Sequence, residues 1–160
     1  MTVNKYSAAL IEEWFEDDNW VELGVNKTSV MKNIRALVPW DGIIDARFFP
    51  QFDSDNVLDR VHLLFITKNI IHHVFLGRSQ VVFSEYPVSN ISIKLKFIYT
   101  ESRKEDSLIM NFDIGEVRED GKPWLHYFIA PAKLRGHAIS LVSLINALKE
   151  GSLYYENTED

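Results

Sequence analysis

The sequence predicts an α+β fold: a seven-stranded antiparallel curved sheet, or partly open barrel, capped by a C-terminal helix and preceded by two N-terminal helices. Three observations support this prediction. Residues 43–129 form short apolar runs separated by turn residues, two of these runs alternate apolar and polar side chains, and a single helical apolar stripe follows them. Sheets with one wetted face are usually antiparallel, and links as short as residues 67–69 allow only hairpins.

Two helices are expected in the first forty residues, because apolar side chains recur there at spacings of three and four. Either Thr28 or Ser29 is expected to cap the second helix, and Pro39 lies where it should end. The apolar positions are Leu10, Ile11, Trp14 and Phe15 in the first helix and Val30, Ile34, Leu37 and Val38 in the second.

Seven strands are expected at residues 43–49, 61–66, 70–76, 81–86, 91–99, 108–114 and 124–129. The fifth strand has the clearest pattern, because its successive side chains alternate between the two faces of the sheet. Its apolar face comprises Ile91, Ile93, Leu95, Phe97 and Tyr99, and its polar face comprises Ser92, Lys94 and Lys96.

A long helix is expected after Pro131, with Gly151 as its stop signal. A coiled-coil seam would give the same spacing, but the repeat lasts barely two heptads, which favours packing against the sheet. We expect this helix to seal the open end of the curved sheet. Its apolar stripe consists of Leu134, Ala138, Leu141, Ile145 and Leu148.

The length fits one compact domain at residues 26–151, with an acidic, partly helical extension at residues 1–25 and an acidic tail at residues 152–160. The net charge of -6 is concentrated in these ends, since residues 26–155 hold 16 Lys or Arg against 14 Asp or Glu. No cation cluster is dense enough to predict a nucleic-acid partner or strong membrane binding. With no cysteine and no signal-like or membrane-spanning segment, the chain is expected to be cytoplasmic.

Three short segments, at residues 38–44, 64–71 and 86–92, resemble motifs of the pleckstrin-homology-like (PH-like) superfold in its bacterial and GRAM-type branches. They are similar, in order, to a helix-to-strand entry, a hairpin and a proline step between strands, and the resemblance covers residues 30–148. It implies a module for binding or assembly without catalysis or cofactor. The acidic segment at residues 51–56, and Asn69 and Ile70 where a basic residue is common, depart from lipid-binding members. We therefore expect no phosphoinositide binding.

No motif predicts catalysis or a metal site. The chain contains no Gly-rich phosphate loop, no nucleophile elbow and no HExxH helix. His72 and His73 are adjacent, so a strand sends their imidazoles to opposite faces, one into a hydrogen-bonded niche and one into solvent. The other histidines are too scattered for a spacing argument. We predict no catalytic residue, no metal and no cofactor.

Two groups of side chains are candidates for binding. Trp14, Phe15 and Trp20 are large apolar groups within a segment of six carboxylates, suited either to a partner protein or to packing under the domain. Lys94 and Lys96 share a strand face that an anion or acidic partner would contact, although nearby carboxylates in the following loop favour a simply solvated face.

Three functional hypotheses follow. The leading one is a non-enzymatic PH-like module that binds a protein or assembles with itself. The second is a small-ligand binder or enzyme of the cone-shaped α+β type, with N-terminal helices closing over a curved sheet. The third is an acidic cytosolic inhibitor or immunity-type protein, whose carboxylates occupy a basic site on a toxin or nuclease.

Overall fold

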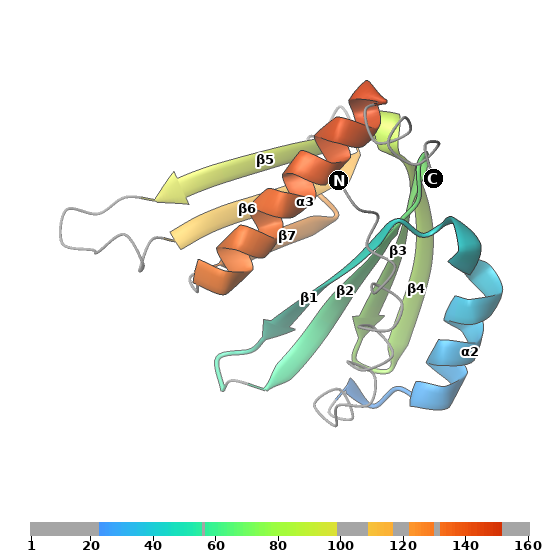
Figure 1. Cartoon of the computed structure of the whole chain (residues 1–160). Coiled ribbons are helices and arrows are strands. Elements are labelled where there is room, and N and C mark those ends of the chain that lie inside the picture. The colour runs from blue at the N-terminus through green and yellow to red at the C-terminus, as the bar shows by residue number, and fades with distance from the viewer. Residues whose placement is uncertain (1–22, 56, 99–108, 117–121, 130–131, 152–160) are drawn as a thin grey trace. The chain divides into compact units, whose positions relative to one another are not determined.

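The protein is described here by a computed structural model, which covers residues 23–55, 57–98, 109–116, 122–129 and 132–151 (Figure 1). The chain divides into two compact units, Met1–Pro87 and Val88–Asp160. None of the described helices is long and apolar enough to cross a membrane. The domain boundaries predicted near residues 25 and 151 are not tested by this division and stay predictions.

The first unit contains a four-stranded antiparallel sheet in which neighbours in sequence are neighbours in space. The predicted hairpin at residues 67–69 is confirmed: Thr67 N donates to the Ile70 carbonyl oxygen at 2.9 Å, which closes a tight link. The strands are β1 (Asp45–Phe52), β2 (Leu58–Ile66), β3 (Ile70–Gly77) and β4 (Gln80–Pro87).

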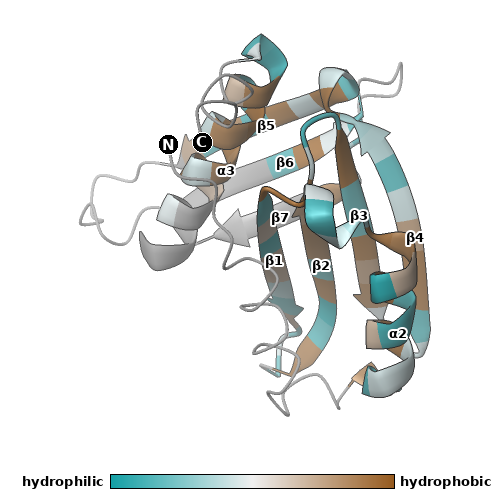
Figure 2. Cartoon of the chain, turned by 45° about the vertical axis from the view of Figure 1, so that its right-hand side comes forward, coloured by the Kyte–Doolittle hydropathy of each residue, from teal (hydrophilic) through white to brown (hydrophobic). Residues whose placement is uncertain are grey.

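One face of this sheet packs against α2 (Lys27–Leu37), as Figure 1 shows. The helix contributes Val30, Met31 and Ile34 to the core, at the three- and four-residue spacing that the sequence predicts. Long apolar stretches of β2 and β3 are visible in Figure 2. The sheet residues in this core are Leu58, Val61, Leu63, Phe65, Val74 and Leu76.

The predicted N-cap of α2 is wrong, because the helix already begins at Lys27. Asn26, and not Thr28 or Ser29, is the N-cap, because its Oδ1 accepts from Ser29 N at 3.0 Å. The end of the helix is as predicted, since Leu37 is its last residue and Pro39 follows. The backbone of Val38 still donates to the Ile34 carbonyl oxygen, which completes the last turn.

We expect Asn26→Ala to lower the free energy of unfolding by about 1 kcal/mol, because an N–H group at the helix start loses its acceptor. Urea unfolding of the full chain measures this change. Asn26→Asp keeps the acceptor and should unfold like the original chain. Asn69→Ala, at an exposed hairpin position, controls for the loss of an amide; a loss as large as that of Asn26→Ala would contradict the cap assignment.

The second unit contains an antiparallel sheet of β5 (Ile91–Ile98), β6 (Ile109–Glu116) and β7 (Leu125–Ile129) with α3 (Ala132–Glu150) alongside it (Figure 1). The predicted alternation in β5 holds through Lys96, but Phe97 is 41% exposed. Lys149 Nζ donates to the Ile91 carbonyl oxygen, which fixes the end of α3 to the start of β5. Among the α3 residues whose side chains the structure describes, the buried ones are Ala138, Leu141, Leu144 and Ile145.

At Gly115, β6 approaches the backbone of the segment before β7 closely. A Cβ atom at this position would lie 2.9 Å from Pro123 Cα and 2.9 Å from Trp124 N. Because both neighbours are backbone atoms, they have no side-chain rotamer with which to give way. β6 therefore touches the segment before β7 at a point where only glycine fits.

The predicted fold class is wrong in its central claim. The strands form two separate antiparallel sheets, β1–β4 and β5–β7, and not one seven-stranded curved sheet or partly open barrel; the α+β class is only partly compatible with them. The break falls at Pro87, which has no N–H to donate and leads into a 3-10 turn at Val88–Asn90.

Two predictions about the helices depended on the single sheet or accompanied it. The terminal helix belongs to the unit of β5–β7, so sealing a seven-stranded sheet is not its role. Of the two predicted N-terminal helices, the second is α2, whereas the first lies outside the described residues.

Candidate functional site

Two buried imidazoles meet on the face of the β1–β4 sheet opposite α2. Alternation along β2 and β3 places His62 and His73 on this face, since Val61, Leu63 and Val74 pack with the helix. His62 Nδ1 lies 2.9 Å from His73 Nε2, and the two rings are within 9° of parallel. The ring centroids are 5.2 Å apart, so the rings meet along their edges in a hydrogen bond between these two nitrogens.

Both imidazoles are neutral at pH 7. Burial, with smaller contributions from His73 and Arg60, lowers the pKa of His62 to about 3. Burial also lowers the pKa of His73 to about 4. A neutral pair suits this hydrogen bond, because one ring nitrogen donates while the other accepts.

His72 lies on the α2 side of the sheet, so the two adjacent histidines do point to opposite faces. Its Nδ1 is 3.5 Å from Glu85 Oε1. Burial lowers the pKa of His72, and the nearby Glu85 carboxylate opposes part of that shift. The expectation that one of the two imidazoles lies in solvent is wrong, because both residues are buried.

The histidine pair has the geometry of a structural contact and not of a catalytic centre. His62 is 4% exposed and His73 is 5% exposed, which leaves no approach for a substrate. Among the described residues, no group of three or more histidine or acidic side chains converges on a possible metal position. The sequence analysis did not predict this pair. The register that follows from the 67–70 hairpin could have indicated it, because it places Leu64 opposite His73 and makes His62 a diagonal neighbour of His73.

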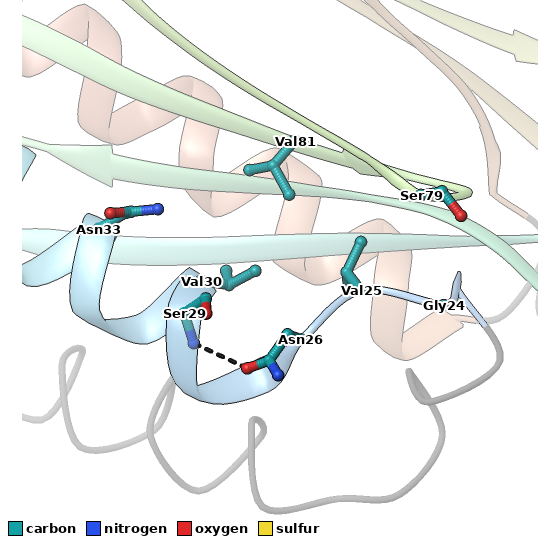
Figure 3. Close-up of a pocket in the computed structure, with 8 residues that line it drawn as sticks. All are labelled: Gly24, Val25, Asn26, Ser29, Val30, Asn33, Ser79 and Val81. Carbon is teal, nitrogen blue, oxygen red and sulfur yellow. Dashed lines mark hydrogen bonds between the residues drawn. The ribbon is translucent and has the colours of Figure 1, made fainter.

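A groove of about 280 Å³ opens between the start of α2 and the start of β4 (Figure 3). One wall is α2, which presents Ser29 and Asn33 one turn apart. The other side is formed by the β3–β4 hairpin and Val81. The lining residues are Gly24, Val25, Asn26, Ser29, Val30, Asn33, Ser79 and Val81.

The lining of the groove is neutral. Its described side chains are amides, hydroxyls and valines, which offer hydrogen bonds and apolar contact but no acid, base or nucleophile pair. The volume lies just below the range of small-molecule pockets, and the groove is open to solvent. These properties suit the side chains of another polypeptide better than a small substrate.

The end of the groove is held by the tip of the β3–β4 hairpin. Ser79 has a φ of 56°, an uncommon conformation for a residue with a side chain, and Gly24 beside it has a φ of 69°. Ser79 N donates to the Leu23 carbonyl oxygen at 2.9 Å. Arg78 forms ion pairs with Asp53 in the β1–β2 loop at 3.2 Å and with Asp59 at the start of β2 at 3.4 Å, which link the hairpin to that end of the sheet.

Of the residues predicted for binding, the described ones, Lys94 and Lys96, do not line this groove. Lys94 and Lys96 lie on β5 in the second unit, where both are exposed, and Asp113 of β6 is opposite Lys94 in the register. Trp14, Phe15 and Trp20 lie outside the described residues, so their predicted role stays a prediction. The groove itself had no sequence signal, since Asn26, Ser29 and Asn33 read as ordinary polar positions of an amphipathic helix.

Comparison of the chain with models of protein families, with curated proteins and with solved structures gives no match. The resemblance to PH-like domains therefore stays a prediction. What this protein does has to be argued from its own geometry.

Proposed function

We propose that this chain is a non-enzymatic module that binds another protein, and that the groove between α2 and β4 is part of its contact surface. The observation that carries the proposal is the neutral, open lining of the groove, formed by two fixed elements of one compact unit. Binding sites on rigid elements hold their geometry better than sites on loops.

The chemistry of the groove favours binding over catalysis. An enzyme of the cone-shaped type needs ionisable side chains that converge on a cavity, whereas the described lining here supplies only Asn, Ser, Val and Gly. The histidines that have perturbed pKa values lie elsewhere in the sheet. The inhibitor hypothesis requires carboxylates at the contact, and the described lining of the groove has none.

Selection from a phage-displayed library of random peptides, with the full chain immobilised, tests this proposal. We expect peptides to be enriched and to bind Asn33→Arg about tenfold more weakly, because the arginine fills the groove and adds a charge to it. Fluorescence anisotropy of labelled peptides measures the dissociation constants.

Asn69→Arg is the matched control. It makes the same chemical change at another exposed position, in the β2–β3 hairpin, and should leave peptide affinity within about twofold. A selection that enriches nothing, or peptides that bind both variants equally, would contradict the proposal.

A further inference from the structure

We infer that an extended segment of a partner protein binds as an additional strand along the outer edge of β4, next to the groove. This inference rests on the proposed function and specifies its mode. Three observations support it: which N–H groups of β4 face away from β3, whether these groups already have a hydrogen-bond acceptor, and whether the groove leaves room for another strand.

The hydrogen-bond pattern fixes which groups face outward. Because Thr67 N donates to the Ile70 carbonyl oxygen, these two residues are a hydrogen-bonded pair, and such pairs alternate along an antiparallel ladder. On β3, the residues that bond β4 are therefore Ile71, His73, Phe75 and Gly77. Their partners on β4 are Tyr86, Ser84, Val82 and Gln80.

The remaining residues of β4 turn their backbone groups away from β3. They are Val81, Phe83 and Glu85, and β4 is the last strand of its sheet. Within the part of the chain that the structure describes, no residue accepts a hydrogen bond from these three N–H groups. They form a row about 14 Å long, at a rise of about 3.4 Å per residue.

This edge lacks the features that usually protect an exposed strand. Natural edge strands carry lysines, prolines or bulges, or are very short. β4 has eight residues in unbroken register with β3, its one charged side chain is Glu85, and its proline is the last residue. In β1, at the opposite edge, Pro50 interrupts the outward row of N–H groups.

The neighbouring groove fits a single added strand. A residue opposite Val81 would place its side chain against Asn33 and Ser29, so an uncharged side chain is expected there. A second copy paired through β4 would bring its own α2 to the same face of the sheet. Packed helices need about 8–10 Å between their axes, so a second copy has to fit both helices beside the joint, whereas a single added strand brings no helix with it.

Amide hydrogen exchange of the full chain, read by NMR, tests the open edge directly. We expect the amides of Val81, Phe83 and Glu85 to exchange rapidly, and those of Val82 and Ser84 to be protected. Slow exchange of the first three in the chain alone would overturn the inference, because the edge would already be paired. Light scattering that shows a dimer with this protection would assign the edge to a second copy.

Addition of a peptide from the selection above should slow exchange of the three outward amides about tenfold or more. N-methylation is placed either on the odd-numbered or on the even-numbered residues of the peptide. One of these two sets should abolish binding and the other should leave it unchanged, because only every second residue of an added strand turns its N–H group toward β4. Some peptides could bind Asn33→Arg more weakly and yet tolerate methylation of either set of residues. That result would overturn the inference of an added strand and leave the proposed function standing.

A substitution in the chain itself gives an independent check. Glu85→Pro removes one outward donor, and Glu85→Ala removes the same side chain but keeps the donor. We expect Glu85→Pro to bind the peptide about fivefold more weakly than Glu85→Ala. Equal affinities of the two variants would contradict the inference.

Discussion

Lowering the pH from 7 to 5 is expected to remove about 4 kcal/mol of the unfolding free energy of the first unit. The cause is the buried pair of His62 and His73, whose pKa values in the folded chain are about 3 and about 4. In the unfolded chain the pKa of both imidazoles lies near the ordinary value of 6.5.

The direction follows from proton binding. Between pH 6.5 and the lowered pKa values, the unfolded chain binds protons that the folded chain excludes, so acid favours unfolding. The full stability is present above pH 6.5. It falls by about 1.4 kcal/mol per histidine for each pH unit below that value, until the folded pKa of that histidine is reached.

Urea unfolding at a series of pH values from 8 to 5 measures this slope. The double variant His62→Leu with His73→Leu removes both titrating groups and both ends of the hydrogen bond between them. We expect its stability to depend much less on pH. An unchanged slope in the double variant would show that other groups cause the acid sensitivity.

His72→Gln is the comparison for this experiment. Glu85 lies 3.5 Å from His72 and favours its protonated form, which opposes the effect of burial. The variant should therefore flatten the pH dependence less than the double variant does. A larger effect from His72→Gln would assign the acid sensitivity to the α2 face of the sheet.

Replacing Phe65 with alanine is expected to lower the free energy of unfolding by about 3–5 kcal/mol. Phe65 is fully buried between the sheet and α2. Its ring meets that of Trp40 edge to face, with centroids 5.8 Å apart and planes at 78°. The variant loses the burial of the ring and leaves a cavity that the surrounding strands cannot close.

Phe52→Ala is the matched control, since Phe52 lies in the same unit but is 54% exposed. It should change the unfolding free energy by at most about 1 kcal/mol. Urea unfolding of both variants, followed by circular dichroism, measures the difference. Similar losses for the two positions would mean that the α2 face is not the core of the first unit.

Local patterns predicted the elements well. The alternation in residues 91–96 and the spacing of Val30 and Ile34 correspond to β5 and α2, because these patterns depend only on strand and helix geometry. The hairpin at Thr67 was predictable for the same reason. The cap was placed wrongly because Asn26, Thr28 and Ser29 all have side chains able to accept a hydrogen bond.

Local sequence patterns did not predict the groove or the histidine pair. Asn33 and Val81 are far apart in the sequence and meet only because α2 lies over the β4 side of the sheet. The outward row on β4 depends on which strand ends the sheet, a property that no single segment carries. The pair of His62 and His73 likewise depends on the register between two strands.

The sequence by itself therefore determined the position of seven strands and of the two described helices, since burial on one side of each element imposes a period on its own residues. Tertiary structure decided that these strands separate into two sheets at Pro87 and that β4 ends one of them. It also decided that the imidazoles of two histidines form a hydrogen bond. The physical reason is that pairing between elements is a competition among long-range contacts, and a period in one segment does not encode its outcome.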